Sequence, residues 1–427
     1  MEQRPGNFAS RVRSCYGCAS HAKRIRKNTD KGRQVRNGDH VVVAGAGPVG
    51  LLTALKLARA GIQVTVVEEL PGIGQWPRAV VYHPPTVAAL DELGLLQDMK
   101  SVGVTKRDYQ WRSVDGEILL ALDMAVVDGK TPYPYNLHLG QHVLADIVLR
   151  HLMREERVTT RWNSEVTGVR QTADDVTLTL KTPEGEQQLT ADWLVGADGA
   201  GSGVRKALGL EFRGITWPER FVVTNVYTDF EDHGYSKAAF VLDPVHYAVI
   251  CQINPEGLWR VAFAESAELP LDTLPDRLPD RLARLIPGPY RLEEMSPFRV
   301  HQRVVDTMRL GRVLLAGDAA HANSPIGGLG LTGGLLDAVA LGDALCAVIA
   351  RGAPESLLDQ YAQDRRDIFV NYTSPTTTEN KRRLAEADPA RRAADREAFR
   401  RIGQDPKLQE SLLMATNRLK GRSFADA

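Results

Sequence analysis

The residues best suited to chemistry begin with three glycines at fixed spacing. Residues 45–50 read Gly-Ala-Gly-Pro-Val-Gly, which fits Gly-x-Gly-x-x-Gly, and they stand between an apolar run and an apolar helical pattern. In such a turn Gly45 permits the tight bend, Gly47 lets the backbone approach a pyrophosphate, and Gly50 lets the helix pack close to the sheet. The phosphates then lie at the positive end of the helix. The segment therefore predicts a dinucleotide site.

An acidic side chain stands where such a site needs one. Residues 64–67 predict a second buried strand, and Glu68 follows it, about 20 residues after the glycines. We expect Glu68, with Glu69 beside it, to bond a ribose hydroxyl. Arg78, in the next loop, is a candidate anion clamp, and a solvated loop arginine is the alternative.

A second stretch repeats the combination of strand, acid and glycine. Residues 191–197 predict a strand, Asp198 and Gly199 follow it, and Arg205 lies in the next helical segment. Glycine there lets the backbone approach a ligand closely. The alternative is a turn without a ligand.

The third stretch ends a strand with Gly317 and Asp318 and continues into a glycine-rich loop. Residues 327–334 contain five glycines, and a helix is expected to begin near Leu331. Asp318 suits a sugar or ribityl hydroxyl, and the helix N-terminus suits an anion or an electron-rich ring.

An α/β (α+β) architecture is expected to position these stretches. It would combine a Rossmann-like nucleotide-binding domain on a parallel sheet, an inserted antiparallel sheet for the substrate and a C-terminal helical segment. The inserted sheet is predicted from residues 212–300, which alternate apolar and polar over several segments. Two antiparallel strands are expected at residues 165–170 and 175–181, and helix breaks near Pro354, Pro375 and Pro389. The expected divisions are a basic disordered leader (1–40), the nucleotide-binding domain (41–210 and 306–350), the substrate domain (211–305) and C-terminal helices (351–427).

Composition excludes several classes of partner. The chain has 53 basic and 53 acidic residues, which favours neither nucleic acid nor a membrane surface. Its longest apolar run, 335–350, is too short to span a bilayer and contains Asp337 and Asp343, so we expect a packed helix and a cytoplasmic protein.

The four cysteines do not form a disulfide framework in a chain of this length. Cys251 and Cys346 lie in apolar runs and are expected to be inert core thiols. Cys15 and Cys18, with His21 nearby, resemble half of a zinc site, but no second pair of ligands follows at zinc spacing, so no metal is expected. A transit peptide or a misassigned start are alternatives for the basic leader.

The three stretches, in this order, resemble the FAD-dependent aromatic hydroxylases, the single-component flavoprotein monooxygenases that include para-hydroxybenzoate hydroxylase. The resemblance covers residues 40–380 and implies FAD as cofactor and NADPH or NADH as reductant, the latter without a nucleotide fold of its own. In the family, residues matching Val49, Glu68, Arg78, Gln141, Asp318 and Leu331 contact FAD, and the residue matching Pro325 lies beside the reacting flavin edge. The full expected cofactor set is Gly45, Gly47, Pro48, Val49, Gly50, Glu68, Glu69, Arg78, Gln141, Asp198, Gly199, Arg205, Gly317, Asp318, Gly328, Gly330 and Leu331.

The resemblance also implies a reaction. NAD(P)H reduces FAD, oxygen adds to give a flavin hydroperoxide, and its distal oxygen attacks an electron-rich phenolate carbon. Residues 214–225, 233–236 and 243–247 are similar to the para-nitrophenol 4-monooxygenases, so a nitrophenol that releases nitrite is one expected substrate. His246 or Tyr247 is the expected proton acceptor, and at most one can point into the pocket because neighbours on a strand face opposite ways.

One departure and several alternatives remain. Residues 328–334 read Gly-Leu-Gly-Leu-Thr-Gly-Gly where many members have Gly-Gln-Gly-Met-Asn-Thr-Gly, so hydrogen bonds to the flavin are expected from the backbone. A flavin halogenase is disfavoured because its Trp-x-Trp-x-Ile-Pro stretch is absent from the sequence. A hydroxylase of a polyketide or quinone ring, or a flavin-loaded protein that sequesters an aromatic ligand, stays open. The partners expected are a small aromatic substrate and molecular oxygen, with neither nucleic acid nor membrane, and a homodimer is a candidate assembly.

Overall fold

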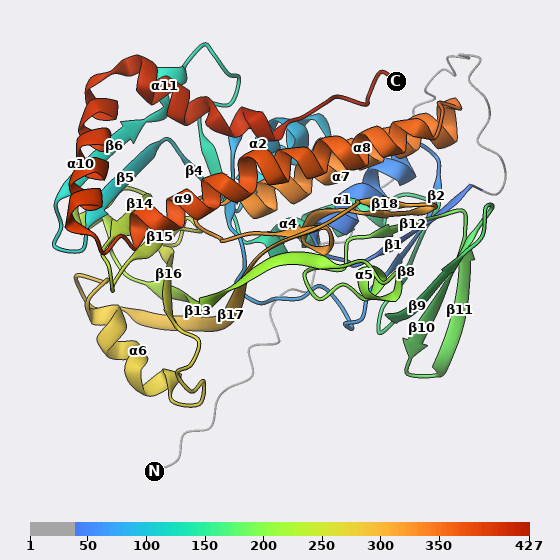
Figure 1. Ribbon diagram of the computed structural model, residues 1–427, viewed down its shortest axis with the longest axis horizontal. Coiled ribbons are helices and arrows are strands. Elements are labelled where there is room, and N and C mark those ends of the chain that lie inside the picture. Colours follow the sequence, from blue (N-terminus) through green and yellow to red (C-terminus); the bar gives the residue numbers. More distant parts are fainter. Residues whose placement is uncertain (1–38) are drawn as a thin grey trace, which may run out of the picture. The chain divides into compact units, whose positions relative to one another are not determined.

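The computed structural model describes residues 39–427 (Figure 1). The predictions for Cys15, Cys18 and His21, and for nearly all of the basic leader, lie outside the described residues. Within them the fold is the mixed α/β architecture expected from the sequence, with parallel and antiparallel sheets and C-terminal helices.

The nucleotide-binding part is built on a six-stranded sheet ordered β18-β19-β12-β1-β2-β8. Neighbouring strands of this sheet pair parallel, except that β18 pairs antiparallel with β19. The strands are β1 (His40–Ala44), β2 (Gln63–Val67), β8 (Val158–Arg161), β12 (Trp193–Gly196), β18 (Arg309–Leu310) and β19 (Val313–Leu315). The β1 valines are fully buried, as expected of a parallel strand with both faces covered.

Helices cover this sheet. The first, α1 (Pro48–Arg59), contacts both α7 (Leu329–Arg351) and α4 (Gln141–Leu152). Three shorter helices are α2 (Pro84–Glu92), α3 (Leu96–Lys100) and α5 (Gly203–Ala207). Among the described residues α7 is the one helix long and apolar enough to cross a membrane, but 72% of its most apolar window is buried inside the protein. It is therefore a core helix, as the sequence indicated.

The substrate sheet has eight strands ordered β20-β17-β13-β16-β15-β14-β5-β6. They are β5 (Asp108–Ser113), β6 (Ile118–Asp123), β13 (Phe212–Tyr227), β14 (Ala238–Leu242), β15 (Ala248–Gln252), β16 (Leu258–Ser266), β17 (Arg291–Val305) and β20 (His321–Ala322). The strands predicted from the alternation of apolar and polar residues are confirmed. The sheet also includes β5 and β6, which lie within residues 41–210, the range expected to form the nucleotide-binding domain, because β5 pairs parallel with β14.

The two faces of this sheet differ in what covers them, since successive side chains point to opposite faces. One face, which we call the outer face, packs Val222, Trp259 and Val261 against helix α6 (Leu274–Ala283). The opposite face, the inner face, packs Phe221 and other side chains against Ile326 of the glycine-rich loop. The inner face is therefore the side of the sheet that meets the nucleotide-binding part.

Two three-stranded antiparallel sheets complete the strands. The first contains β9 (Glu165–Gln171), β10 (Val176–Thr182) and β11 (Gly185–Ala191), which confirms the predicted antiparallel insertion. The second orders β3 (Val81–Tyr82), β7 (Asn136–His138) and β4 (Val104–Lys106).

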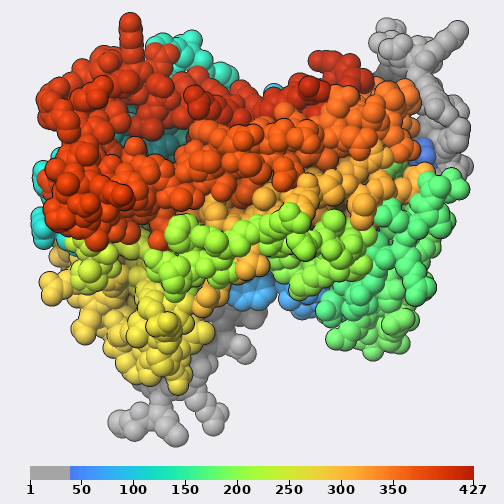
Figure 2. All heavy atoms as spheres, in the orientation of Figure 1, coloured from blue at the N-terminus to red at the C-terminus, as the bar shows by residue number. Residues whose placement is uncertain are grey.

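The C-terminal part is helical, and its helices form a continuous band across the face shown in Figure 2. They are α8 (Ser356–Ile368), α9 (Ser374–Leu384), α10 (Pro389–Gln404) and α11 (Pro406–Met414). Breaks occur at Pro354 and before Pro389, as predicted. The predicted break at Pro375 is wrong. A π-helical turn, Phe369–Thr373, joins α8 to α9 without interruption, so Pro375 lies inside a continuous helical run.

Candidate active site

The three stretches singled out in the sequence meet at one edge of the parallel sheet. A Cβ added to Gly45 would lie 2.4 Å from the carbonyl oxygen of Ala197 and 2.9 Å from the Cα of Asp198. A Cβ added to Gly317 would lie 3.1 Å from the Val49 side chain. The contacts join the ends of β1, β12 and β19, the edge where open α/β sheets bind ligands.

Glu68 lies at this edge but turns toward the glycine turn. Its Oε2 accepts a hydrogen bond from the Ala46 N–H (2.7 Å), and its Oε1 accepts one from the Leu70 N–H (3.1 Å). Burial raises the pKa of the Glu68 carboxyl, and these two N–H groups oppose the rise. Glu69 is exposed. A ribose bond to Glu68 stays a prediction.

Arg78, Asp318 and Pro325 are exposed, although they adjoin buried strands and loops. Within residues 39–427 the side chains of Arg78 and Asp318 make no hydrogen bond. Protein packed around Asp318 raises its pKa, while His321 and Arg78 oppose the rise. An exposed carboxylate and an exposed guanidinium near the glycine turn are suited to a ligand with both hydroxyl and phosphate groups.

The glycine turn leaves room for that ligand. A Cβ added to Gly47 would meet nothing within 4 Å, so open space adjoins the N-terminus of α1. Gln141 begins α4, and its N–H donates to the carbonyl of Ala79 (3.0 Å). Ala79 follows Arg78 in the chain, so the start of α4 lies close to Arg78. These residues fit a bound dinucleotide.

Asp198 and Arg205 are engaged with the protein itself. Asp198 accepts hydrogen bonds from the Ser202 hydroxyl (2.6 Å) and the Val204 N–H (3.0 Å), which fixes the start of α5. Arg205 is buried and donates to the carbonyls of Ala200 (2.8 Å) and Ala319 (3.0 Å). The pair thus ties the second stretch to the third, and direct contact of either with a cofactor stays a prediction.

A buried ion triad supports the Gly317–Asp318 turn, and sequence reasoning missed it. Asp337 accepts hydrogen bonds from the Gly317 N–H (2.9 Å), His321 Nε2 (2.7 Å) and Arg365 Nε (2.7 Å). Arg365 also donates to the carbonyl of Leu419 (2.8 Å). His321 and Arg365 hold the pKa of Asp337 well below its usual range. The available signal was an acid inside an otherwise apolar helix.

The glycine-rich loop approaches the three-stranded sheet of β3, β7 and β4, here called the small sheet. Gly328 caps α7 in a left-handed conformation (φ 66°), and His83 Nε2 lies 2.9 Å from the carbonyl oxygen of Gly327. Leu331 is buried in the first turn of α7, and Gly330 is half-buried beside it. The loop that holds Pro325 is therefore fixed from both the sheet and the helix.

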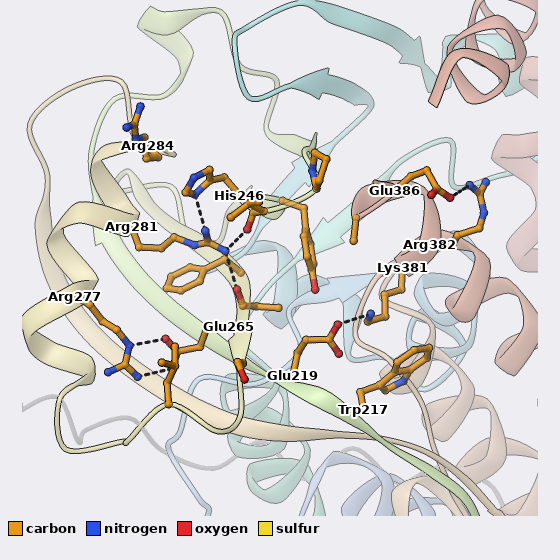
Figure 3. A pocket seen from close by; sticks show the side chains of 18 of the residues that line it. Trp217, Glu219, His246, Glu265, Arg277, Arg281, Arg284, Lys381, Arg382 and Glu386 are labelled. Carbon is orange, nitrogen blue, oxygen red and sulfur yellow. Dashed lines mark hydrogen bonds and ion pairs between the residues drawn. The ribbon is translucent and has the colours of Figure 1, made fainter. Parts of the chain in front are cut away.

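The two expected proton acceptors, His246 and Tyr247, lie in the connection between β14 and β15, and both line one cavity. His246 lines a cavity of about 950 Å³ between α6 and α9, where Nη1 of Arg281 lies 2.6 Å from its Nδ1 (Figure 3). Burial and Arg281 lower the pKa of His246. Tyr247 also borders this cavity, and its ring packs on the inner face with Phe221 and Ile326. Burial raises the pKa of Tyr247, so its hydroxyl stays protonated near neutral pH.

The cavity of Figure 3 contains none of the expected cofactor residues. Its walls carry ion pairs such as Lys381 with Glu219 (2.9 Å) and Arg277 with Glu265 (2.8 Å). Of the two expected acceptors, Tyr247 packs in one cluster with Ile326, the residue after Pro325, whereas His246 meets Arg281 of α6.

Replacing Tyr247 by phenylalanine should leave the free energy of unfolding unchanged or slightly raise it. The hydroxyl is buried and has no hydrogen-bond partner among the described residues, so its removal ends a desolvation cost of about 1–3 kcal/mol. Denaturant unfolding measures the effect. A loss of more than about 1 kcal/mol would reveal a water or side-chain partner for the hydroxyl.

Comparison with known proteins shows the family of this chain. Residues 39–374 match the family described as FAD binding domain. The chain belongs to this FAD-binding family. It is 48% identical over 389 residues to para-nitrophenol 4-monooxygenase of Pseudomonas sp. (strain WBC-3), which covers 90% of this chain and 96% of the relative. It is 42% identical to 6-hydroxy-3-succinoylpyridine 3-monooxygenase of Pseudomonas putida (strain DSM 28022 / S16), over 82% of this chain and 90% of the relative.

A solved structure shows the same fold. The crystal structure of p-nitrophenol 4-monooxygenase from Pseudomonas putida DLL-E4 has a TM-score of 0.88 and 47% sequence identity, and the match covers 90% of this chain and 99% of that one. The chain is thus a flavoprotein monooxygenase that uses FAD, as its resemblance to the aromatic hydroxylases implied.

Proposed function

We propose that the protein hydroxylates a para-nitrophenol or a closely related phenol at the substituted carbon. The observation that carries the proposal is the meeting of all three glycine stretches at one sheet edge, in a chain 48% identical to a para-nitrophenol 4-monooxygenase. For para-nitrophenol, one O₂ and the two electrons of one NAD(P)H give benzoquinone, nitrite and water. Bound FAD supplies the oxygen chemistry.

The chain's own residues have binding and orienting roles in this proposal. Backbone at Gly47 and the α1 N-terminus bind the pyrophosphate, while Glu68 and Asp318 bond sugar or ribityl hydroxyls. Arg78 neutralises phosphate charge. The inner face around Phe221 and Ile326 provides a dry wall for an aromatic ring beside Pro325.

Replacing Glu68 or Asp318 by alanine should weaken FAD binding about tenfold or more, because a charged hydrogen bond contributes ~1.5–3 kcal/mol. Titration of each apoprotein with FAD, followed by flavin fluorescence, gives the dissociation constants. Glu184→Ala, in an exposed turn of the β10–β11 hairpin, is the control and should bind FAD as the wild type does. Wild-type affinity in both test variants would remove these residues from the site.

The function itself is tested by following NADH and NADPH oxidation with a panel of phenols while measuring nitrite and hydrogen peroxide. Stimulated oxidation with stoichiometric nitrite from para-nitrophenol is the expected result. Peroxide without nitrite would make the phenol an effector, and no stimulation by any phenol would favour a flavin-loaded binding protein.

A hydroxypyridine is the second candidate substrate, and the 42% identity to the pyridine monooxygenase supports it. The same assay with 6-hydroxy-3-succinoylpyridine separates the two substrates. We further propose a cytoplasmic enzyme that acts without nucleic acid or membrane, supported by its balanced charge and by the burial of α7. A homodimer stays a prediction.

A further inference from the structure

An amine is buried without a hydrogen-bond partner in the three-stranded sheet of β3, β7 and β4. Lys106 ends β4 and is 1% exposed. Its Nζ makes no hydrogen bond to any described residue and lies 3.2 Å from the centroid of the Tyr109 ring. A buried cationic group without a partner is costly, so it calls for an explanation in the protein's function.

The neighbours of Lys106 are also incompletely bonded. Asn136 is opposite Lys106 on β7, and His138 lies two residues further along the same face. Oδ1 of Asn136 and Nε2 of His138 are buried and have no hydrogen-bond partner in the described part of the chain. The three side chains thus lie on one face of the β4–β7 pair, here called the polar region, and carry a buried amine and two further buried polar atoms.

This polar region adjoins both the substrate sheet and the loop beside Pro325. His138 Nδ1 lies 2.9 Å from the carbonyl oxygen of Gln252 on β15, and His83 Nε2 lies 2.9 Å from that of Gly327. Val81 of the small sheet packs with Cys251 of the inner face. The polar region and the aromatic wall at Phe221 therefore lie along the same face of the sheet.

We propose that Lys106 is the base that takes the proton from the substrate's phenol hydroxyl. The phenol O–H bond breaks, an N–H bond forms on the neutral amine, and the products are a phenolate and an ammonium ion held as a pair. Asn136 and His138 orient the two. The inference rests on the proposed phenol substrate.

The pKa values of Lys106 and of the two nearby histidines support the assignment of Lys106 as the base. Burial lowers the pKa of Lys106 to about 7, and Asp108 and Cys251 oppose the fall. Burial lowers the pKa of His83 to about 4 and of His138 to about 3, which makes both weak bases. A base whose pKa lies near the working pH is the most effective, so Lys106 suits the task better than either histidine.

The test replaces Lys106 by methionine, which keeps the length of the side chain. Because the amine is buried without a hydrogen-bond partner, K106M should raise the thermal unfolding midpoint by a few degrees, about 2–4 °C. It should also lower kcat with para-nitrophenol about a hundredfold. Absorbance of bound para-nitrophenol should show its ionisation midpoint moved up by about one pH unit or more. K181M, which removes a surface lysine of β10, should match the wild type in all three measurements.

The outcomes separate this inference from the proposed function. If K106M binds para-nitrophenol and ionises it at the wild-type pH, Lys106 is not the base, whatever happens to kcat. If K106M loses stability, the amine has a structural partner and the inference fails. If the wild type binds no phenol, the substrate proposal itself fails.

Discussion

Replacing Asp337 by alanine is expected to cost about 3–5 kcal/mol of unfolding free energy and to abolish retention of FAD. The carboxylate is fully buried, and it pairs with both Arg365 and His321. Its removal leaves the Arg365 guanidinium buried with no charge partner, and it frees the N–H of Gly317 beside the expected ribityl contact. Denaturant unfolding of the apoprotein and its FAD content after purification measure the two effects.

Asp343→Ala is the matched control. Asp343 lies on the same helix and pairs with Lys56 at 2.8 Å, but both side chains are partly exposed, so its loss should cost about 1 kcal/mol or less. Equal losses in the two variants would contradict a special role for Asp337.

The Asp337 effect should also depend on pH. The folded pKa of Asp337 lies below its unfolded value of about 3.9, so the carboxylate's contribution is complete above that pH and falls away as pH drops toward the folded pKa. The difference between wild type and variant should therefore narrow below about pH 4.

The second large effect concerns the first glycine turn. A Cβ on Gly50 would lie 2.0 Å from the carbonyl oxygen of Gly45, a backbone atom that cannot move without shifting β1. We expect G50A to lose about 3 kcal/mol or more and to accumulate as insoluble protein. Soluble yield and the thermal midpoint of any soluble fraction measure this.

The Gly47→Ala variant is compared with Gly50→Ala because it separates FAD binding from stability. Its Cβ would meet nothing in the protein within 4 Å, so the apoprotein should unfold at the wild-type midpoint. A bound pyrophosphate would meet the added methyl group, so FAD affinity should fall about tenfold or more. Wild-type affinity in G47A would place the phosphates elsewhere.

Sequence reasoning was strongest where a signal is local. The turn at Gly45 and the strand before it are adjacent in the chain, and the alternation in residues 212–300 predicted an antiparallel sheet that the structure confirms. Both predictions depend on the spacing of residues that are close in the chain, and a single sequence shows this spacing directly.

What the sequence did not show depends on distant partners. The residues near Arg365 and Lys106 in the chain do not indicate that Arg365 bonds Asp337 or that Lys106 is buried under the Tyr109 ring. The predicted helix break at Pro375 is wrong because a π-helical turn, which has no clear sequence signature, lets the helix continue. His246 and Tyr247 lie in the connection before β15 and not on the strand, so the alternation of side chains on a strand does not apply to them.

The parallel pairing of β5 with β14 has a consequence for engineering this protein. Residues 108–113 cover the edge of a strand that lies more than 120 residues later in the chain, and Trp111 stacks on Phe240 across the pair at 5.1 Å. A graft of residues 211–305 alone into another scaffold would leave β14 as a bare, apolar edge, open to pairing with a second chain. Exchange of substrate preference between relatives therefore requires both segments to be transplanted together.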